Sequence, residues 1–237
     1  MPIYRIADLN VEVNPKFKIC RKRLESYAVK SNESGKTDIA ISVSDGEIRE
    51  RLRLSDNLSE QGAEDVLILS KFCNAVLDGF DGFFFHSSCL ELDGEGYVFS
   101  AVSGTGKSTH TALWRRHFGN RVTMINDDKP VIRKCDGKFY AYGTPWMGKA
   151  DIGTNTKAPV KAVYILQRAE ENTAVRVLPP QVMKQLLEAT VIDVERSRME
   201  KLLELLDEFF KETPLFLLGC NMDESAVMTA YNAANGG

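Results

Sequence analysis

Residues 97–109 restrict the fold of this chain more than any other stretch of the sequence. An apolar run over 97–100 leads into a short loop with Gly104 and Gly106, which closes on Gly-Lys-Ser at the expected start of a helix. Glycine lets a loop turn its backbone N–H groups inward and approach a ligand closely. A strand, a glycine-containing loop and a helix in this order are typical of a phosphate-binding P-loop. We therefore expect a phosphate site here.

The side chains that follow the glycines have matching chemistry. Lys107 would bring a charge to the β- and γ-phosphates, and the hydroxyl of Ser108 is placed to ligate Mg²⁺. The helix N-terminus adds its dipole and unpaired N–H groups. The residues expected to contact a nucleotide are Ser103, Gly104, Thr105, Gly106, Lys107, Ser108 and Thr109. The pattern G-x-x-x-x-G-K-[ST] has glycine where this chain has Ala101, and an ordinary glycine-rich turn is the alternative interpretation.

Composition excludes several classes of protein. At 237 residues, with 43% hydrophobic and 27% charged residues, the chain suits a soluble globular protein. A net charge of −3 gives no reason to expect a nucleic acid partner. Five cysteines without a C-x-x-C pair argue against a disulfide framework or zinc site. Without a signal-peptide pattern or a long apolar run, we expect a cytoplasmic protein with no membrane partner.

The first 80 residues carry no recognisable chemistry, and we expect them to elaborate a core formed by residues 81–237, in one compact unit. A basic run at 16–23 favours a solvated strand over a site for an acidic partner. The expected strands are 3–6, 9–13, 38–44 and 48–54, and apolar positions at helical spacing predict a helix over 63–77.

The remainder alternates strands and helices. Runs at 83–92 and 97–100, separated by a Gly-rich turn, predict a β-hairpin with His86 on its first strand. The other expected strands are 121–128, 131–134, 138–141, 160–167, 174–178 and 214–218, and the expected helices are 108–118, 181–189, 194–210 and 224–234.

The expected strand over 121–128 ends on Asp127 and Asp128. Strand alternation directs neighbouring side chains to opposite sides, so the two carboxylates can have different tasks. Beside a phosphate loop, one acid can hold the Mg²⁺ shell and another can take the proton of an attacking hydroxyl. A plain Asp-Asp turn is the alternative. Lys149 and Lys157 could neutralise a transferring phosphoryl group or merely be solvated.

His86, the loop 103–108 and the Asp127-Asp128 pair together resemble the HPr kinase/phosphorylase and phosphoenolpyruvate carboxykinase superfamily. The resemblance implies an α/β fold with a mixed, twisted P-loop sheet and added N-terminal strands. It also implies an ATP- and Mg²⁺-dependent kinase that phosphorylates a hydroxyl of a peptide, protein or small metabolite. In that scheme Asp128 is the general base, Asp127 joins Ser108 in the metal shell, and His86 orients the base. A homo-oligomer is compatible with the resemblance.

Two alternatives stay open. The glycine- and arginine-rich signature that follows the Asp pair in HPr kinases is absent, and Ala101 replaces a glycine. A nucleotide-binding regulatory module that transfers nothing is therefore the second hypothesis. A carboxykinase-type enzyme is the third, although no residues suggest an oxaloacetate site.

Overall fold

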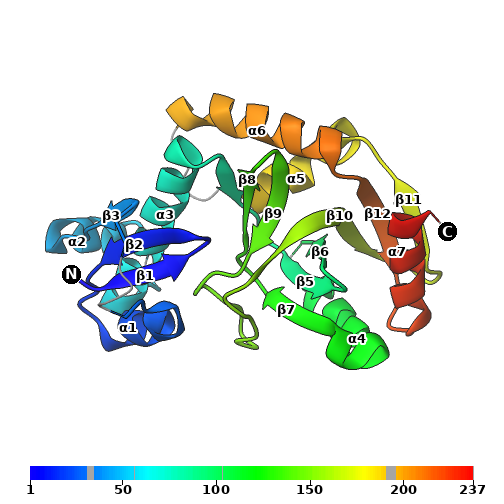
Figure 1. Ribbon diagram of the computed structural model, residues 1–237, viewed down its shortest axis with the longest axis horizontal. Coiled ribbons are helices and arrows are strands. Elements are labelled where there is room, and N and C mark those ends of the chain that lie inside the picture. The colour runs from blue at the N-terminus through cyan, green and yellow to red at the C-terminus, as the bar shows by residue number, and fades with distance from the viewer. Residues whose placement is uncertain (31–34, 56, 103, 191–195, 237) are drawn as a thin grey trace.

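The computed structural model describes residues 1–237 except 31–34, 56, 103, 191–195 and 237. The described strands form a small three-stranded sheet near the N-terminus and a nine-stranded mixed sheet. The two termini lie at opposite ends of the molecule in this view (Figure 1). The mixed α/β fold class expected from the sequence is confirmed.

The N-terminal part packs its small sheet beside a long helix. Its elements are β1 (Ile3–Ile6), β2 (Leu9–Val13), α1 (Lys18–Leu24), β3 (Ile39–Ile41), α2 (Asp45–Arg53) and α3 (Glu60–Gly79). Strand β2 pairs antiparallel with β1 and parallel with β3. The predicted helix is α3, whose positions Leu69, Cys73 and Val76 are buried as the helical spacing requires.

Two predicted strands in this part are wrong. The basic run 16–23 contains most of α1, because Cys20 and Leu24, four residues apart, are the positions that become buried. The run 48–54 belongs to α2, which begins with a capping box. Ser44 Oγ accepts a hydrogen bond from the backbone N–H of Glu47, and the Ser44 N–H donates to the Glu47 carboxylate at 2.8 Å.

Strand β10 is the centre of the large sheet. It pairs parallel with β6 and β12 and antiparallel with β9. The strands are β4 (Gly82–Phe84), β5 (Ser88–Leu92), β6 (Glu95–Ser100), β7 (Val122–Asn126), β8 (Val131–Cys135), β9 (Lys138–Tyr142), β10 (Lys157–Arg168), β11 (Thr173–Arg176) and β12 (Leu215–Cys220). Seven strands pair in the order β4-β8-β9-β10-β6-β5-β7. Strand β12 also pairs with β10, and β11 pairs with β12.

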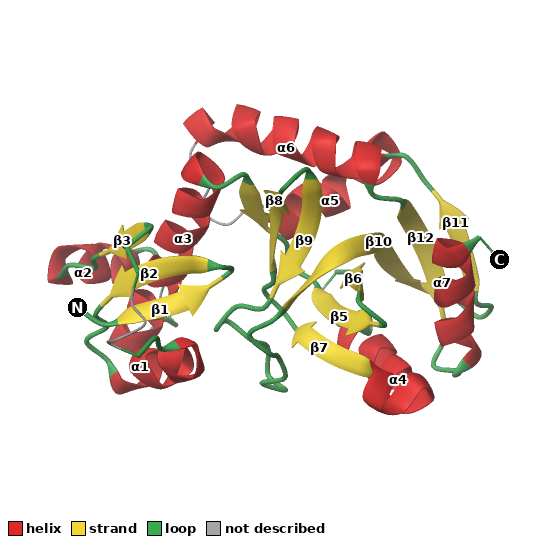
Figure 2. Ribbon diagram, in the orientation of Figure 1, coloured by secondary structure: helices red, strands yellow, loops and turns green. Residues whose placement is uncertain are grey.

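Helices cover both faces of this sheet (Figure 2). They are α4 (Lys107–Phe118), α5 (Met183–Thr190), α6 (Met199–Glu212) and α7 (Ser225–Asn235). Val163 and Ile165 of β10 share a core with α5 and α6, whereas Tyr164 shares a second core with α4 and α7. Alternation along β10 therefore supplies both cores. Leu203 of α6 is exposed, and residues 194–195 of the helix predicted over 194–210 lie outside the described residues.

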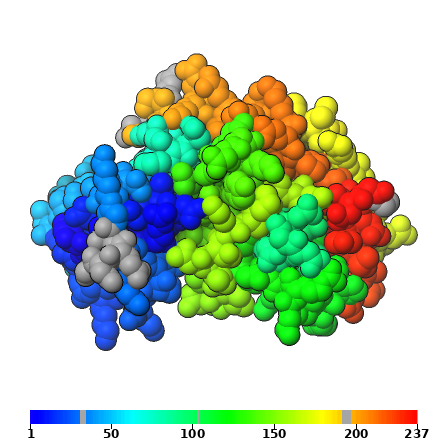
Figure 3. Space-filling model, viewed as in Figure 1, coloured from blue at the N-terminus to red at the C-terminus, as the bar shows by residue number. Residues whose placement is uncertain are grey.

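The N-terminal part and the large sheet share one apolar cluster, which contains Val11, Phe72, Val131 and Trp146. Phe72 of α3 stacks on Trp146 with ring centroids 5.6 Å apart. The surfaces of the two parts meet along the side of β8 and β9 (Figure 3). Within the described residues, no helix has the length and apolar character needed to cross a membrane.

Candidate functional site

Two glycines in the loop between β6 and α4 have backbone conformations that favour glycine. Gly104 has φ +80° and Gly106 has φ +124°, values that residues with a Cβ rarely adopt. An added Cβ would meet no atom within 4 Å at either position, so the backbone conformation and not space demands glycine. Ala101 is not among the described residues with positive φ. Ser103 lies outside the described residues.

Lys107, the first residue of α4, turns its side chain back over the start of this loop. Its Nζ donates a hydrogen bond to the Ala101 carbonyl at 3.1 Å and lies 3.5 Å from His86 Nε2. Burial lowers the pKa of Lys107, and the nearby charge of Asp128 opposes that shift. The loop thus holds a partly desolvated cation beside His86.

The strand predicted over 121–128 ends at Asn126, and the two carboxylates lie in the turn that follows β7. Asn126 is fully buried, and its Oδ1 accepts hydrogen bonds from the backbone N–H groups of Asp128 at 2.8 Å and Lys129 at 2.6 Å. Asp127 Oδ1 accepts instead from the backbone N–H of Gly148 at 2.7 Å. The pair therefore has two different sets of partners.

Asp128 is held between two basic groups. Its Oδ1 lies 2.9 Å from His86 Nε2, and its Oδ2 accepts a hydrogen bond from the Lys129 ammonium. Burial on its own would raise the pKa of Asp128, but the hydrogen bonds from His86 and Lys129 hold it well below the ordinary value. The carboxylate is consequently ionised at neutral pH.

His86 does not lie on a hairpin strand, which corrects the sequence interpretation. The hairpin is β5–β6, and residues 85–87 form a connection between β4, which pairs with β8, and β5. The His86 N–H donates to the Ala189 carbonyl at 2.7 Å, and its carbonyl accepts from Ser100 Oγ at 3.0 Å. Backbone contacts to α5 and β6 therefore fix the imidazole beside Asp128.

A cavity of about 580 Å³ brings these groups together. All four residues predicted to be catalytic line it, as do five predicted to contact a nucleotide: His86, Gly104, Gly106, Lys107, Ser108, Thr109, Asp127 and Asp128. We call this cavity the phosphate cavity. Lys149 also lines it and makes no hydrogen bond or ion pair within the described part of the chain. Lys157 is not among the residues that line this cavity; its Nζ lies 2.5 Å from Asp8 Oδ2.

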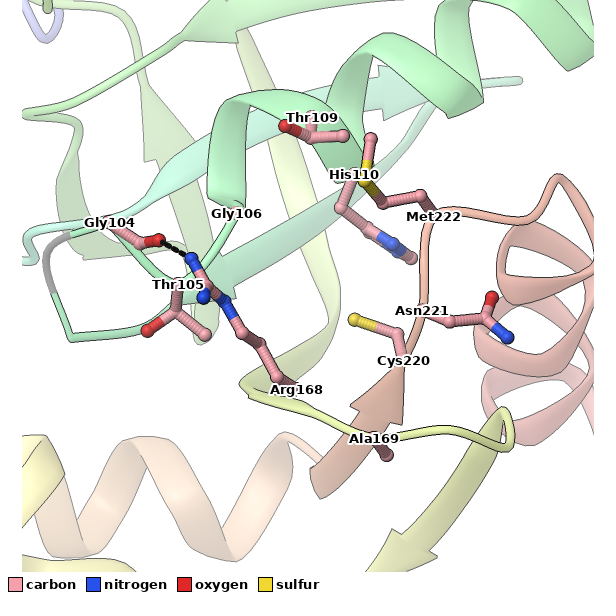
Figure 4. Close-up of a pocket in the computed structure, with 10 residues that line it drawn as sticks. All are labelled: Gly104, Thr105, Gly106, Thr109, His110, Arg168, Ala169, Cys220, Asn221 and Met222. Atoms are coloured by element: carbon pink, nitrogen blue, oxygen red, sulfur yellow. Dashed lines mark hydrogen bonds between the residues drawn. The ribbon is translucent and has the colours of Figure 1, made fainter.

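A second cavity of about 460 Å³ adjoins the same loop (Figure 4). Gly104, Gly106 and Thr109 line both cavities, and the second one also contains Thr105. Its remaining lining comes from α4 and from the carboxyl ends of β10 and β12: His110, Arg168, Ala169, Cys220, Asn221 and Met222. Arg168 Nη2 donates to the Gly104 carbonyl at 2.7 Å, which attaches the loop to β10.

Several of these residues were missed from the sequence. Asn126 and Lys129 flank the Asp pair, and an Asn at a strand end is a recognisable signal for a side-chain-stabilised turn. Gly148 had only its position in a Gly- and Pro-rich loop to mark it. No cluster of three or more His, Cys, Asp or Glu suited to a metal ion occurs within the described residues.

No known protein-family model matches this chain, and no curated protein is similar to it in sequence. The fold is weakly similar to a solved structure, the Hpr(Ser) kinase/phosphatase from Coxiella burnetii. That similarity has a TM-score of 0.38 and 12% sequence identity, and it covers 65% of this chain and 93% of that chain.

Proposed function

We propose that this protein is an ATP- and Mg²⁺-dependent phosphotransferase that phosphorylates a hydroxyl of a peptide, protein or small metabolite. One observation carries the proposal: the Asp128–His86 pair, 2.9 Å apart, lines the same cavity as Lys107 and Ser108. A base, a cation and a hydroxyl beside a glycine loop are the groups that phosphoryl transfer needs.

Asp128 is the group proposed to receive the proton. The acceptor oxygen attacks the γ-phosphorus, the bond to the β-phosphate oxygen breaks, and the hydroxyl proton passes to Asp128. A carboxylate of low pKa is a weak base, which suits a loose transition state in which the hydroxyl loses its proton late. His86 orients the carboxylate through its Nε2 contact.

The cations around the phosphate cavity are proposed to stabilise the negative charge of the transferring phosphoryl group. Lys107 at the loop and Lys149, which lines the same cavity, are available to neutralise charge on the transferring group. Ser108 and Asp127 offer the hard oxygen ligands that Mg²⁺ prefers, and proteins commonly hold this ion with one or two such groups plus substrate phosphates. When bound there, Mg²⁺ would neutralise phosphate charge.

A second candidate is a nucleotide-binding regulatory module. The contact from the Lys129 ammonium to Asp128 favours it, because this ion pair competes with an acceptor hydroxyl for the carboxylate. The two candidates share nucleotide binding and differ in the transfer step.

The deciding experiment has two parts. Calorimetric titration of Mg-ATP into the wild type and Lys107→Ala tests binding, with the exposed Lys211→Ala as the matched control. Transfer from γ-labelled ATP to a panel of hydroxyl peptides and small alcohols then compares the wild type with Asp128→Asn and the control Asp207→Asn. Binding that only Lys107→Ala loses, and transfer that only Asp128→Asn loses, support the kinase. Binding without Asp128-dependent transfer supports the regulatory module, and no binding to the folded wild type contradicts both.

A further inference from the structure

His110 carries a buried hydrogen-bond donor without an acceptor. The residue is 2% exposed, and its Nε2 accepts a hydrogen bond from Trp114 Nε1 at 3.0 Å. A ring nitrogen that accepts carries no proton, so in the neutral imidazole the proton is on Nδ1. Burial lowers the pKa of His110 to about 4, which keeps the ring neutral. Nδ1 has no hydrogen-bond partner among the described residues. A buried donor that stays unsatisfied is costly, so this group is available to a ligand that enters the cavity.

The ring belongs to the second cavity. It extends from α4 toward the segment 220–222 (Figure 4). This cavity and the phosphate cavity share Gly104, Gly106 and Thr109 as lining residues. A ligand whose phosphates contact the loop can therefore continue past it into the second cavity.

The other lining groups suit a flat, partly polar ring. Arg168 presents a planar guanidinium at the carboxyl end of β10, and Met222 presents a thioether side chain that is 79% exposed. A guanidinium stacks on aromatic rings, and a thioether packs against them. Ligands of α/β proteins also bind preferentially outside the carboxyl ends of parallel strands, which is where β10 and β12 end.

We propose that the second cavity binds the nucleoside half of the nucleotide, with His110 Nδ1–H donating a hydrogen bond to an acceptor atom of the base. The inference rests on the proposed function, because it assumes that the triphosphate lies in the phosphate cavity. It adds a subsite in which the base contributes affinity beyond that of the phosphates.

The test compares Mg-ATP with Mg-tripolyphosphate, which has the phosphates and no nucleoside. His110→Gln is the informative variant, since its amide oxygen can replace Nε2 as the acceptor for Trp114 while no donor remains at the Nδ1 position. We expect the wild type to bind Mg-ATP more tightly than tripolyphosphate. His110→Gln should weaken Mg-ATP about fivefold to tenfold and leave tripolyphosphate unchanged. Lys107→Ala should weaken both ligands.

Equal binding of both ligands by the wild type would overturn the subsite, as would a His110→Gln variant that weakens both ligands alike. If neither ligand binds the folded wild type, the proposed function fails and the subsite fails with it, which distinguishes that result from the other two. Cys220→Phe provides a second route that leaves His110 in place. Filling the cavity should exclude Mg-ATP while tripolyphosphate still binds, and unchanged ATP affinity in this variant would also contradict the proposal.

Discussion

His86 Nε2 and Asp128 Oδ1 lie 2.9 Å apart, although the two residues come from separate segments beside different strands. Backbone hydrogen bonds hold His86 to Ala189 and Ser100, and Asn126 holds the turn that carries Asp128. Both partners are therefore positioned by the fold itself. If Asp128 is the proton acceptor, as we propose, this arrangement requires little reorganisation when a hydroxyl binds.

His86→Ala should move the acidic limb of the transfer rate to higher pH. Asp128 loses the largest of the hydrogen bonds that lower its pKa, so a higher pH is needed to keep it ionised. We expect the rate at neutral pH to fall about tenfold to a hundredfold. The measurement is a pH profile of kcat/KM, with His86→Gln as the conservative control that retains a donor. An unshifted acidic limb would exclude His86 as the residue that orients Asp128.

Two substitutions that exchange glycine and alanine in the loop should have different effects. Gly106→Ala places a Cβ at φ +124°, a strain of about 1–3 kcal/mol, and should weaken Mg-ATP binding about tenfold or more. Ala101→Gly should leave affinity unchanged and lower stability by about 0.4–1 kcal/mol through the unfolded chain. Titration calorimetry and urea unfolding of both variants check this. A large gain in affinity from Ala101→Gly would show that Ala101 impairs the loop.

Stability should fall with acidification because of His110. Its folded-state pKa of about 4 lies below the ordinary histidine value of 6.5, so the unfolded state binds more protons between these values. The folded protein should lose about 2 kcal/mol of unfolding free energy between about pH 7.5 and about pH 5 from this group. Urea unfolding of the wild type and His110→Gln at both pH values isolates the contribution. The same acid sensitivity in both proteins would assign it to other groups.

Ser44→Ala should destabilise the N-terminal part by about 1 kcal/mol, because it removes the side-chain oxygen that caps α2. Ser44→Thr, which keeps the oxygen, is the control. Equal stability of the alanine variant and the wild type in thermal unfolding would indicate that the cap contributes nothing.

Local patterns predict much of this fold. The turns Asp93-Gly94 and Asp136-Gly137, with positive φ at both residues, join the hairpins that the sequence indicated. The same kind of evidence fails for α1 and α2, where charged and apolar residues alternate closely enough to imitate a strand. There the decisive information is tertiary, because packing against α3 selects which apolar residues are buried.

The candidate site was also predicted only in part from the sequence. The sequence predicted that His86, Lys107, Asp127 and Asp128 act together, and the structure places all four around one cavity. Their chemical roles stay predictions. The second cavity could not be foreseen, since His110, Arg168 and Cys220 meet only through the parallel pairing of β10 with β6 and β12. Nothing in the local sequence specifies that long-range register.

Trp146 stacks on Phe72, and two residues later the Gly148 N–H holds Asp127. The position of the Asp127 carboxylate thus depends on packing against α3, a helix that contributes no residue to the lining of the phosphate cavity. In a mutational scan, some loss-of-function positions should therefore lie in α3. Phe72→Ala, for example, should disturb the hydrogen bond to Asp127 although no residue that lines the cavity is changed. Inactivating substitutions would then be found both at residues that line the cavity and at buried residues that hold those residues in position.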